Sequence, residues 1–286
     1  MSTGSAEPVC AHGVESPNPG ALRDRSPRRF FLLVFALSVP FWLIGAVTDL
    51  QLMPGLSVSA LMAFCPMVAA LILVHGESRT AGVTELLRRS FDFNRIRVKR
   101  WYVPILLLMP AVNVAVYALM SWMEVPLPAP QVPTLLQVLA AALMFLAFFI
   151  GALGEELGWS GYVIDPMQVR WSALQASLIL GVVGVVWHIV PLLLIHRSST
   201  WIAWWCLYAV AARILIVWLY NNTGKSVFAA ALFHATLNLT FMLFPVDGSH
   251  FDMRLGGLVM AFAAAIVTVA WGPKTLAGYE RGDATL

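Results

Sequence analysis

Charged residues are scarce in this chain of 286 residues: 12% are Asp, Glu, Lys or Arg, whereas 59% are hydrophobic. A soluble domain carries charge on roughly a quarter of its residues. This shortage argues against an ordinary soluble enzyme. The mean hydropathy of +0.78 is instead typical of a protein that crosses a membrane several times.

Cysteine is also rare, and Cys10, Cys65 and Cys206 are scattered without a CxxC pair. Their spacing predicts no disulfide framework. No small-residue cleavage site follows the first apolar stretch at the right distance, so we expect no cleavable signal peptide. The absence of an internal repeat gives no support to a transporter built from inverted halves.

Apolar stretches of roughly 20 residues, long enough to cross a bilayer, occur eight times. They cover residues 30–49, 56–75, 102–123, 137–160, 174–195, 201–220, 226–244 and 255–272. The sequence therefore predicts an all-α, polytopic membrane bundle of about eight transmembrane helices within 29–273. Residues 1–28, rich in Ser, Pro, Gly and charge, predict a disordered cytoplasmic N-terminal tail, and 274–286 a short C-terminal tail.

Basic residues are concentrated in two places, with four arginines in 23–29 and seven Lys or Arg in 79–100, out of 18 in all. Cytoplasmic loops carry such an excess. An even number of spans puts both termini on one side, and both clusters then predict cytoplasmic termini. This pattern fits a multi-pass protein of a bacterial plasma membrane, although an endoplasmic-reticulum membrane also stays open. Beside membrane spans, it predicts no nucleic-acid partner.

The segment 80–100 links two of these spans. It has Val83, Leu86, Leu87 and Phe91 near helical spacing. Such spacing is typical of an amphipathic helix at the membrane interface. A charged connecting loop explains the composition equally well, and both interpretations stay open.

Ionisable side chains within the predicted spans are few, and such residues usually face a cavity or one another. Away from the span ends they are Glu155, Glu156, His188, Arg213 and His234, and the predicted spans also contain the polar residues Asn113 and Asn238. Neighbours on a helix point about 100° apart. The two adjacent glutamates therefore cannot have the same task.

His234 and Asn238 are four residues apart and thus lie on one helix face. Their N–H groups can hold an oxyanion. Equally, Glu155, His188 and His234 can form a three-ligand metal site with one open position. Histidines that only join helices, glutamates paired with Arg213, and a proton relay in a transporter are the competing interpretations.

Four glycines, Gly151, Gly154, Gly158 and Gly161, recur at intervals of three and four residues around the two glutamates. They predict a smooth stripe that allows another helix to come close.

Three motifs follow in order on the fourth, fifth and seventh predicted spans: Glu155–Glu156–Leu157–Gly158–Trp159–Ser160, Gly184 to His188, and His234 to Asn238. Together they resemble the EExxxR, FxxxH and HxxxN motifs of the CPBP family of intramembrane proteases, which includes CAAX prenyl endopeptidases, bacteriocin-processing and abortive-infection proteins. The resemblance covers about 135–245, which we expect to be the catalytic core, including the segment YNNTGKS at 220–226.

The resemblance implies a membrane-embedded endopeptidase in which Glu155 activates a water molecule that His188 helps to hold. His234 and Asn238 would stabilise the tetrahedral oxyanion, and Glu156 would orient groups or balance charge. It implies either a metalloprotease, with Glu155, His188 and His234 binding a divalent metal such as Zn, or a metal-free mechanism.

The expected partners are the lipid bilayer and a peptide or membrane-protein substrate, whose scissile bond is reached from the cytoplasmic side. The oligomeric state and the natural substrate are not indicated, nor is it indicated whether that substrate is prenylated.

Two positions depart from the family pattern, because Ser160 stands at the arginine of EExxxR and Gly184 at the phenylalanine of FxxxH. Our hypothesis is that Arg213, which lies deep in its span, replaces the missing cation beside Glu156. Ser160 also favours an alternative: a catalytically impaired membrane scaffold or bacteriocin immunity factor of the same fold.

Overall fold

The protein forms a bundle of long helices in a computed structural model that describes residues 19–48, 50–53, 56–128 and 132–278. The long helices are α2 (Pro27–Val47), α3 (Cys65–Arg88), α4 (Tyr102–Trp122), α5 (Leu135–Gly158), α7 (Ala173–Leu194), α8 (Ser199–Asn222), α9 (Val227–Met242) and α10 (Met253–Trp271). Within the described ranges, seven helices are long and apolar enough to cross a membrane, and α9 is a shorter apolar helix. The predicted all-α polytopic bundle is confirmed.

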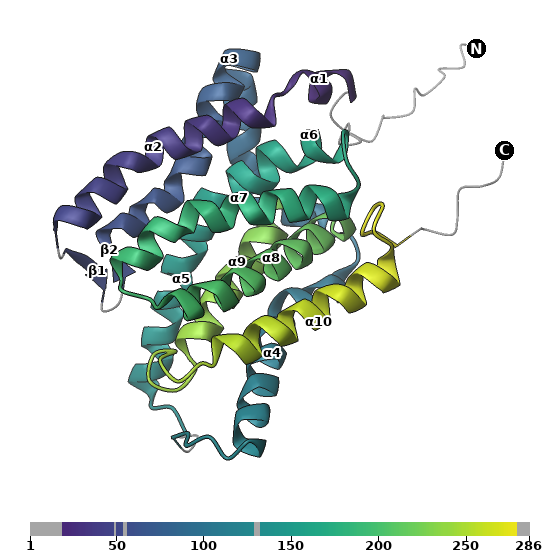
Figure 1. The fold of residues 1–286 in the computed structure, drawn as a ribbon. Helices are drawn as coiled ribbons and strands as arrows, with labels where there is room; N and C mark the ends of the chain where they lie inside the picture. The colour runs from purple at the N-terminus through teal and green to yellow at the C-terminus, as the bar shows by residue number, and fades with distance from the viewer. Residues whose placement is uncertain (1–18, 49, 54–55, 129–131, 279–286) are drawn as a thin grey trace, which may run out of the picture.

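Shorter elements join these helices. They are α1 (Pro19–Asp24), β1 (Gln51–Met53), β2 (Leu56–Ser57), η1 (Val58–Phe64), η2 (Arg89–Phe91), η3 (Phe93–Arg95), η4 (Lys99–Trp101), η5 (Trp159–Val163, a π-helix) and α6 (Ile164–Gln168). β1 and β2 form an antiparallel hairpin. In Figure 1, this hairpin lies at the end of the bundle opposite α1 and the C-terminal end of α10.

The predicted N-terminal tail is shorter than expected. Residues 1–18 of the predicted range 1–28 lie outside the described residues, but Pro19–Asp24 form a helix and α2 already begins at Pro27. Leu22 is buried, and the Arg170 guanidinium donates to the carbonyl of Arg25 at 2.9 Å. These contacts attach the segment to the bundle. Of the predicted C-terminal tail, 274–278 are described.

The segment 80–100 is helical in its first part and forms short turns in its second. α3 continues to Arg88 after a break at Arg79, whose φ of 54° and ψ of −149° are not helical. Three short 3₁₀ turns then lead to α4. Helical spacing predicted the first part, whereas the second part is connecting structure.

Helix ends in the core region are capped by side chains, which fixes where each helix begins. Thr134 and Ser172 form capping boxes at the starts of α5 and α7. Ser198 and Ser226 accept hydrogen bonds from backbone N–H groups at the starts of α8 and α9. Between these helices, α5 packs on α9 and α3, and α8 packs on α7 and α10.

Candidate active site

The predicted site residues come from three helices that meet around one cavity of about 160 Å³. Glu155 on α5, His188 on α7, and His234 and Asn238 on α9 all line it. Arg213 on α8 lines the same cavity. The structure thus brings together residues that are distant in the sequence. The most distant of them, Glu155 and Asn238, are 83 positions apart.

Glu156, the one predicted site residue that does not line this cavity, is fully buried and holds three polar partners. Its Oε2 atom lies 2.9 Å from Nη1 of Arg213 and accepts the Ser160 hydroxyl at 2.5 Å. Its Oε1 atom lies 3.1 Å from Nδ1 of His234. A buried carboxylate is tolerated when it is paired and hydrogen-bonded in this way. Glu156 therefore links α5 to α8 and α9.

The predicted pairing of Arg213 with Glu156 is confirmed by this contact. The cation that the family motif carries one turn along α5 comes here from a different helix, 57 positions further along the chain. The Arg213 side chain is 11% exposed, so its charge is held inside the bundle next to the carboxylate.

Ser160 takes part in the same arrangement by a hydrogen bond rather than a charge. It lies in η5, four residues after Glu156, and is 2% exposed. A hydrogen bond to a charged group contributes about 1.5–3 kcal/mol. The hydroxyl thus supplements Arg213 at one carboxylate oxygen.

Replacing Ser160 with alanine is expected to lower the free energy of unfolding by about 1.5–3 kcal/mol and to leave peptide cleavage largely intact, because Arg213 and His234 still hold Glu156. Thermal unfolding and cleavage assays in detergent measure both effects. Ser177→Ala is a matched control, since this buried serine donates to the carbonyl of Ala173 in its own helix. Loss of cleavage in a folded Ser160→Ala protein would contradict this supporting role.

Glu155 has a different environment from its neighbour. It is 8% exposed, accepts the Trp159 indole N–H at 3.3 Å, and forms no salt bridge within the described ranges. Whereas the charge of Glu156 is balanced by Arg213, the Glu155 carboxylate faces cavity space. The prediction that the two glutamates cannot share a task agrees with this difference.

Both histidines are oriented through their Nδ1 atoms. His188 Nδ1 lies 2.8 Å from the carbonyl of Gly184, and His234 Nδ1 lies 3.1 Å from Glu156. Each partner oxygen accepts, so each Nδ1 carries a proton, and in a neutral ring Nε2 has the lone pair. These contacts fix the direction of each imidazole ring relative to its helix.

Two glycines of the predicted stripe allow η1 and the start of α3 to approach α5 closely. A Cβ at Gly154 would lie 2.8 Å from the Ala63 carbonyl oxygen, and one at Gly158 would lie 2.5 Å from that of Pro66. Gly161 approaches Leu86, whereas a Cβ at Gly151 would have no neighbour within 4 Å. The stripe is thus a packing surface at its centre.

A second, larger cavity of about 390 Å³ adjoins the first. Glu155, His188 and Asn238 line both. The rest of its lining is mostly apolar and comes from the hairpin, η1, α5, α7 and the residue after α7. Examples are Leu52, Ala60, Met62, Phe64, Phe148, Pro191, Leu192 and Ile195. On the side of the smaller cavity, a Cβ at Gly184 would meet nothing within 4 Å. Gly184, which stands at the phenylalanine of FxxxH, therefore leaves open space in the smaller cavity.

The predicted metal ligands Glu155, His188 and His234 line one cavity, but they are not gathered into a metal centre. Across the described ranges, no group of three His, Cys, Asp or Glu side chains is arranged to hold a metal ion. The donor types suit zinc, whereas their placement in this structure does not fit a three-ligand site.

Two side-chain contacts near the site were not predicted from the sequence. Trp159 donates to Glu155, and Asn113 donates to the carbonyl of Thr240, which joins α4 to α9. A tryptophan four residues after a glutamate on a helix was a usable signal. The partner of Asn113 depends on how two distant helices pack, so the sequence offered no signal for it.

Two comparisons with known proteins found similar sequences. The family model described as "Type II CAAX prenyl endopeptidase Rce1-like" matches residues 136–240, a range that contains every predicted site residue. A CAAX prenyl protease 2 from Methanococcus maripaludis is 26% identical over 271 residues, which cover 85% of this chain and 93% of the relative. The chain is thus similar to CAAX prenyl endopeptidases across its candidate catalytic core, and its long apolar helices support an integral, multi-pass membrane protein.

Proposed function

We propose that Glu155 is the general base of a peptide-bond hydrolysis that takes place inside the bundle. The observation that carries this proposal is the contrast between the two glutamates: Glu156 is held by Arg213, Ser160 and His234, whereas Glu155 faces both cavities. A positioned carboxylate can take a proton from water within hydrogen-bond reach.

In the proposed reaction, Glu155 removes a proton from water, and the resulting hydroxide attacks the scissile carbonyl carbon. The His188 ring, fixed through Nδ1, holds the water. Asn238 and His234 donate N–H groups to the oxyanion, and His234 does so through Nε2 when its ring carries both protons. The C–N bond then breaks, and Glu155 returns its proton to the leaving amine.

Glu156 acts on this chemistry through His234. Its Oε1 atom fixes Nδ1 of that ring, and its second oxygen is neutralised by Arg213. With His234 doubly protonated, two carboxylates face two cations, so the buried site is electrically balanced. The supporting ion pair also weakens the alternative of an impaired scaffold or immunity factor, since Ser160, the feature that favoured it, does not leave Glu156 without a cation.

A divalent metal such as Zn is not needed for these steps. Glu155, His188 and His234, the ligands that the sequence suggested for it, are not arranged as a three-ligand site in the described part of the chain. We expect cleavage by the purified protein to persist in a chelator such as EDTA. Loss of cleavage that returns on adding Zn²⁺ would contradict the metal-free mechanism and leave the endopeptidase proposal intact.

The substrate is proposed to be a peptide with an apolar group beside the scissile bond. The large apolar cavity next to Glu155 supports this, because buried apolar surface contributes about 25 cal/mol per Å² to binding. The relative from Methanococcus maripaludis is named a CAAX prenyl protease, so a prenylated peptide is one member of this class.

The proposed function is tested by incubating the purified protein with matched peptides, one prenylated at its cysteine, one extended by apolar residues and one polar, and identifying products by mass spectrometry. We expect cleavage of an apolar or prenylated peptide by the wild-type protein and none by Glu155→Ala. Equal product patterns for the two proteins would rule out the proposal.

A further inference from the structure

A buried tryptophan holds one oxygen of the candidate general base. The Trp159 indole N–H donates to Oε2 of Glu155 at 3.3 Å, and the tryptophan is 1% exposed. Among the described residues, no group donates a hydrogen bond to Oε1 of the same carboxylate. Both side chains line the smaller cavity. The two oxygens of Glu155 therefore differ, because Oε2 has a protein donor and Oε1 is left for a reactant.

Aromatic rings on two other helices keep the Trp159 indole in place. Phe30 on α2 meets it edge to face with ring centroids 5.4 Å apart, and Trp187 on α7 does so at 5.6 Å. This is a favoured geometry for aromatic pairs. Both of these rings are fully buried. The indole is therefore packed on two sides and has little freedom to turn away from Glu155.

Trp187 is itself attached to α2. Its indole N–H donates to the Ser38 hydroxyl at 2.7 Å, and that buried hydroxyl donates to a carbonyl of its own helix at 2.8 Å. The Trp187 ring also lies edge-on to the ring of His188, with centroids 4.6 Å apart. Through these two tryptophans, α2 supports the helices that carry Glu155 and His188. α2 contains none of the three motifs and lies outside the matched range 136–240.

Resting on the proposed function, we propose that Trp159 is a positioning residue for the general base. By holding Oε2 of Glu155, the indole directs Oε1 to the water, so Oε1 is the oxygen that takes the proton. The hydroxide formed in this way attacks the scissile carbonyl carbon, as in the proposed reaction. Trp159 itself transfers no proton, because an indole N–H is a hydrogen-bond donor only. Phe30 acts one step further away by holding the indole.

The variant Trp159→Phe tests this role, because it keeps an aromatic ring and removes the N–H. We expect kcat to fall about 10-fold to 100-fold, the effect of losing one hydrogen bond to a charged group. KM should stay close to the wild-type value, because a misaligned base slows the chemical step and does not change the binding of the peptide. Initial rates over a range of peptide concentrations measure both constants. A wild-type kcat in a folded Trp159→Phe protein would overturn the proposal.

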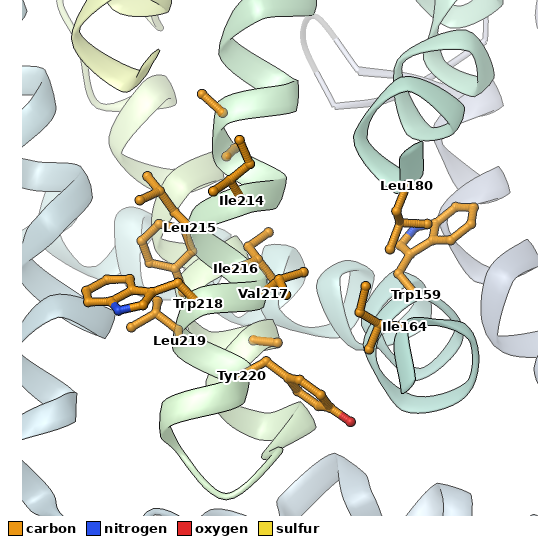
Figure 2. Packing of buried hydrophobic residues seen from close by; sticks show 14 of the residues in the cluster. Trp159, Ile164, Leu180, Ile214, Leu215, Ile216, Val217, Trp218, Leu219 and Tyr220 are labelled. Atoms are coloured by element: carbon orange, nitrogen blue, oxygen red, sulfur yellow. The ribbon is translucent and has the colours of Figure 1, made fainter. Parts of the chain in front are cut away.

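Trp218→Phe is the matched control for lost packing. Trp218 is also buried and meets Trp101 and Trp271 edge to face, but its indole N–H has no hydrogen-bond partner among the described residues. Figure 2 shows its ring pointing away from Trp159, and it lines neither of the two cavities. The two substitutions remove the same atoms, so both should lower the unfolding temperature. Only Trp159→Phe should lower kcat, and an equal loss of kcat in both variants would assign the effect to packing and overturn the proposal.

Phe30→Leu extends the test to α2. It keeps the Trp159 N–H but removes the ring that holds the indole, so kcat should fall by a smaller factor than in Trp159→Phe. Phe35→Leu is its control, because Phe35 lies on the same helix and its ring contacts Trp42. Equal kcat values for the two leucine variants would overturn the role assigned to Phe30.

A double-mutant cycle in thermal unfolding tests the contact without catalysis. Trp159→Phe and Glu155→Ala remove the two partners of one hydrogen bond, so their effects on stability should not be additive, whereas those of Trp218→Phe and Glu155→Ala should be. Additive effects in the first pair would overturn the contact on which the proposal rests. A wild-type protein that cleaves no peptide would contradict the proposed function, and the cycle would still show whether Trp159 holds Glu155.

Discussion

Replacing Arg213 with alanine is expected to lower the free energy of unfolding by about 3–5 kcal/mol, which is the usual effect of removing one partner of a buried ion pair. The substitution leaves the Glu156 carboxylate fully buried with hydrogen bonds but without its cation. Thermal unfolding in detergent measures the loss. Arg213→Lys should recover part of the stability, because it keeps the charge but not the planar guanidinium.

The double variant Arg213→Ala with Glu156→Gln separates this cause from loss of packing. Removing the unpaired charge of the Glu156 carboxylate should make the double variant more stable than Arg213→Ala alone, as expected for two coupled residues. An Arg213→Ala protein with wild-type stability and cleavage would show that Arg213 does not replace the motif cation. Equal stability of the single and double variants would point to packing instead.

Replacing Glu155 with glutamine is expected to lower kcat by about 10²–10⁴-fold, the usual contribution of a general base. The amide has nearly the same shape, but it cannot take a proton from water. The unfolding temperature should change little, because Glu155 forms no salt bridge in the described structure and the amide oxygen still accepts from Trp159. Initial rates with the best-cleaved peptide measure the effect.

Two controls make this result specific. Glu85→Gln changes an exposed glutamate on α3 and should affect neither rate nor stability. Glu156→Gln should lower both, since it weakens contacts to Arg213, Ser160 and His234. A Glu155→Gln protein that keeps more than a tenth of the wild-type rate would contradict the role of Glu155 as the base.

The helices could be predicted because their signal is local. A run of about 20 apolar residues satisfies its own backbone hydrogen bonds as a helix in lipid, whatever its neighbours are. The structure accordingly has helices at all eight predicted spans, with α9 the shortest at 16 residues. The predicted N-terminal tail extended too far toward the first span. Leu22 is buried, and the Arg25 carbonyl accepts a hydrogen bond from Arg170, so this part of the segment is attached to the bundle.

The candidate site residues could also be named from sequence, because Glu155, Glu156, His188, His234 and Asn238 are polar where polarity is costly and their spacing matches motifs. The different roles of Glu155 and Glu156 could not be predicted from the sequence. That Ser160 and Arg213 share one oxygen of Glu156, while Glu155 is left facing the cavities, depends on the rotation of α5 relative to α8 and α9.

Composition and the order of residues were therefore sufficient for the membrane bundle and the set of residues at its centre, since each follows from runs or spacings along one helix. Tertiary packing decided which carboxylate is paired with a cation, where open space lies beside Gly184, and that the larger cavity extends from Glu155 to the hairpin. Ion pairs and cavities form between segments far apart in the chain, and their geometry depends on how whole helices are turned and spaced against one another.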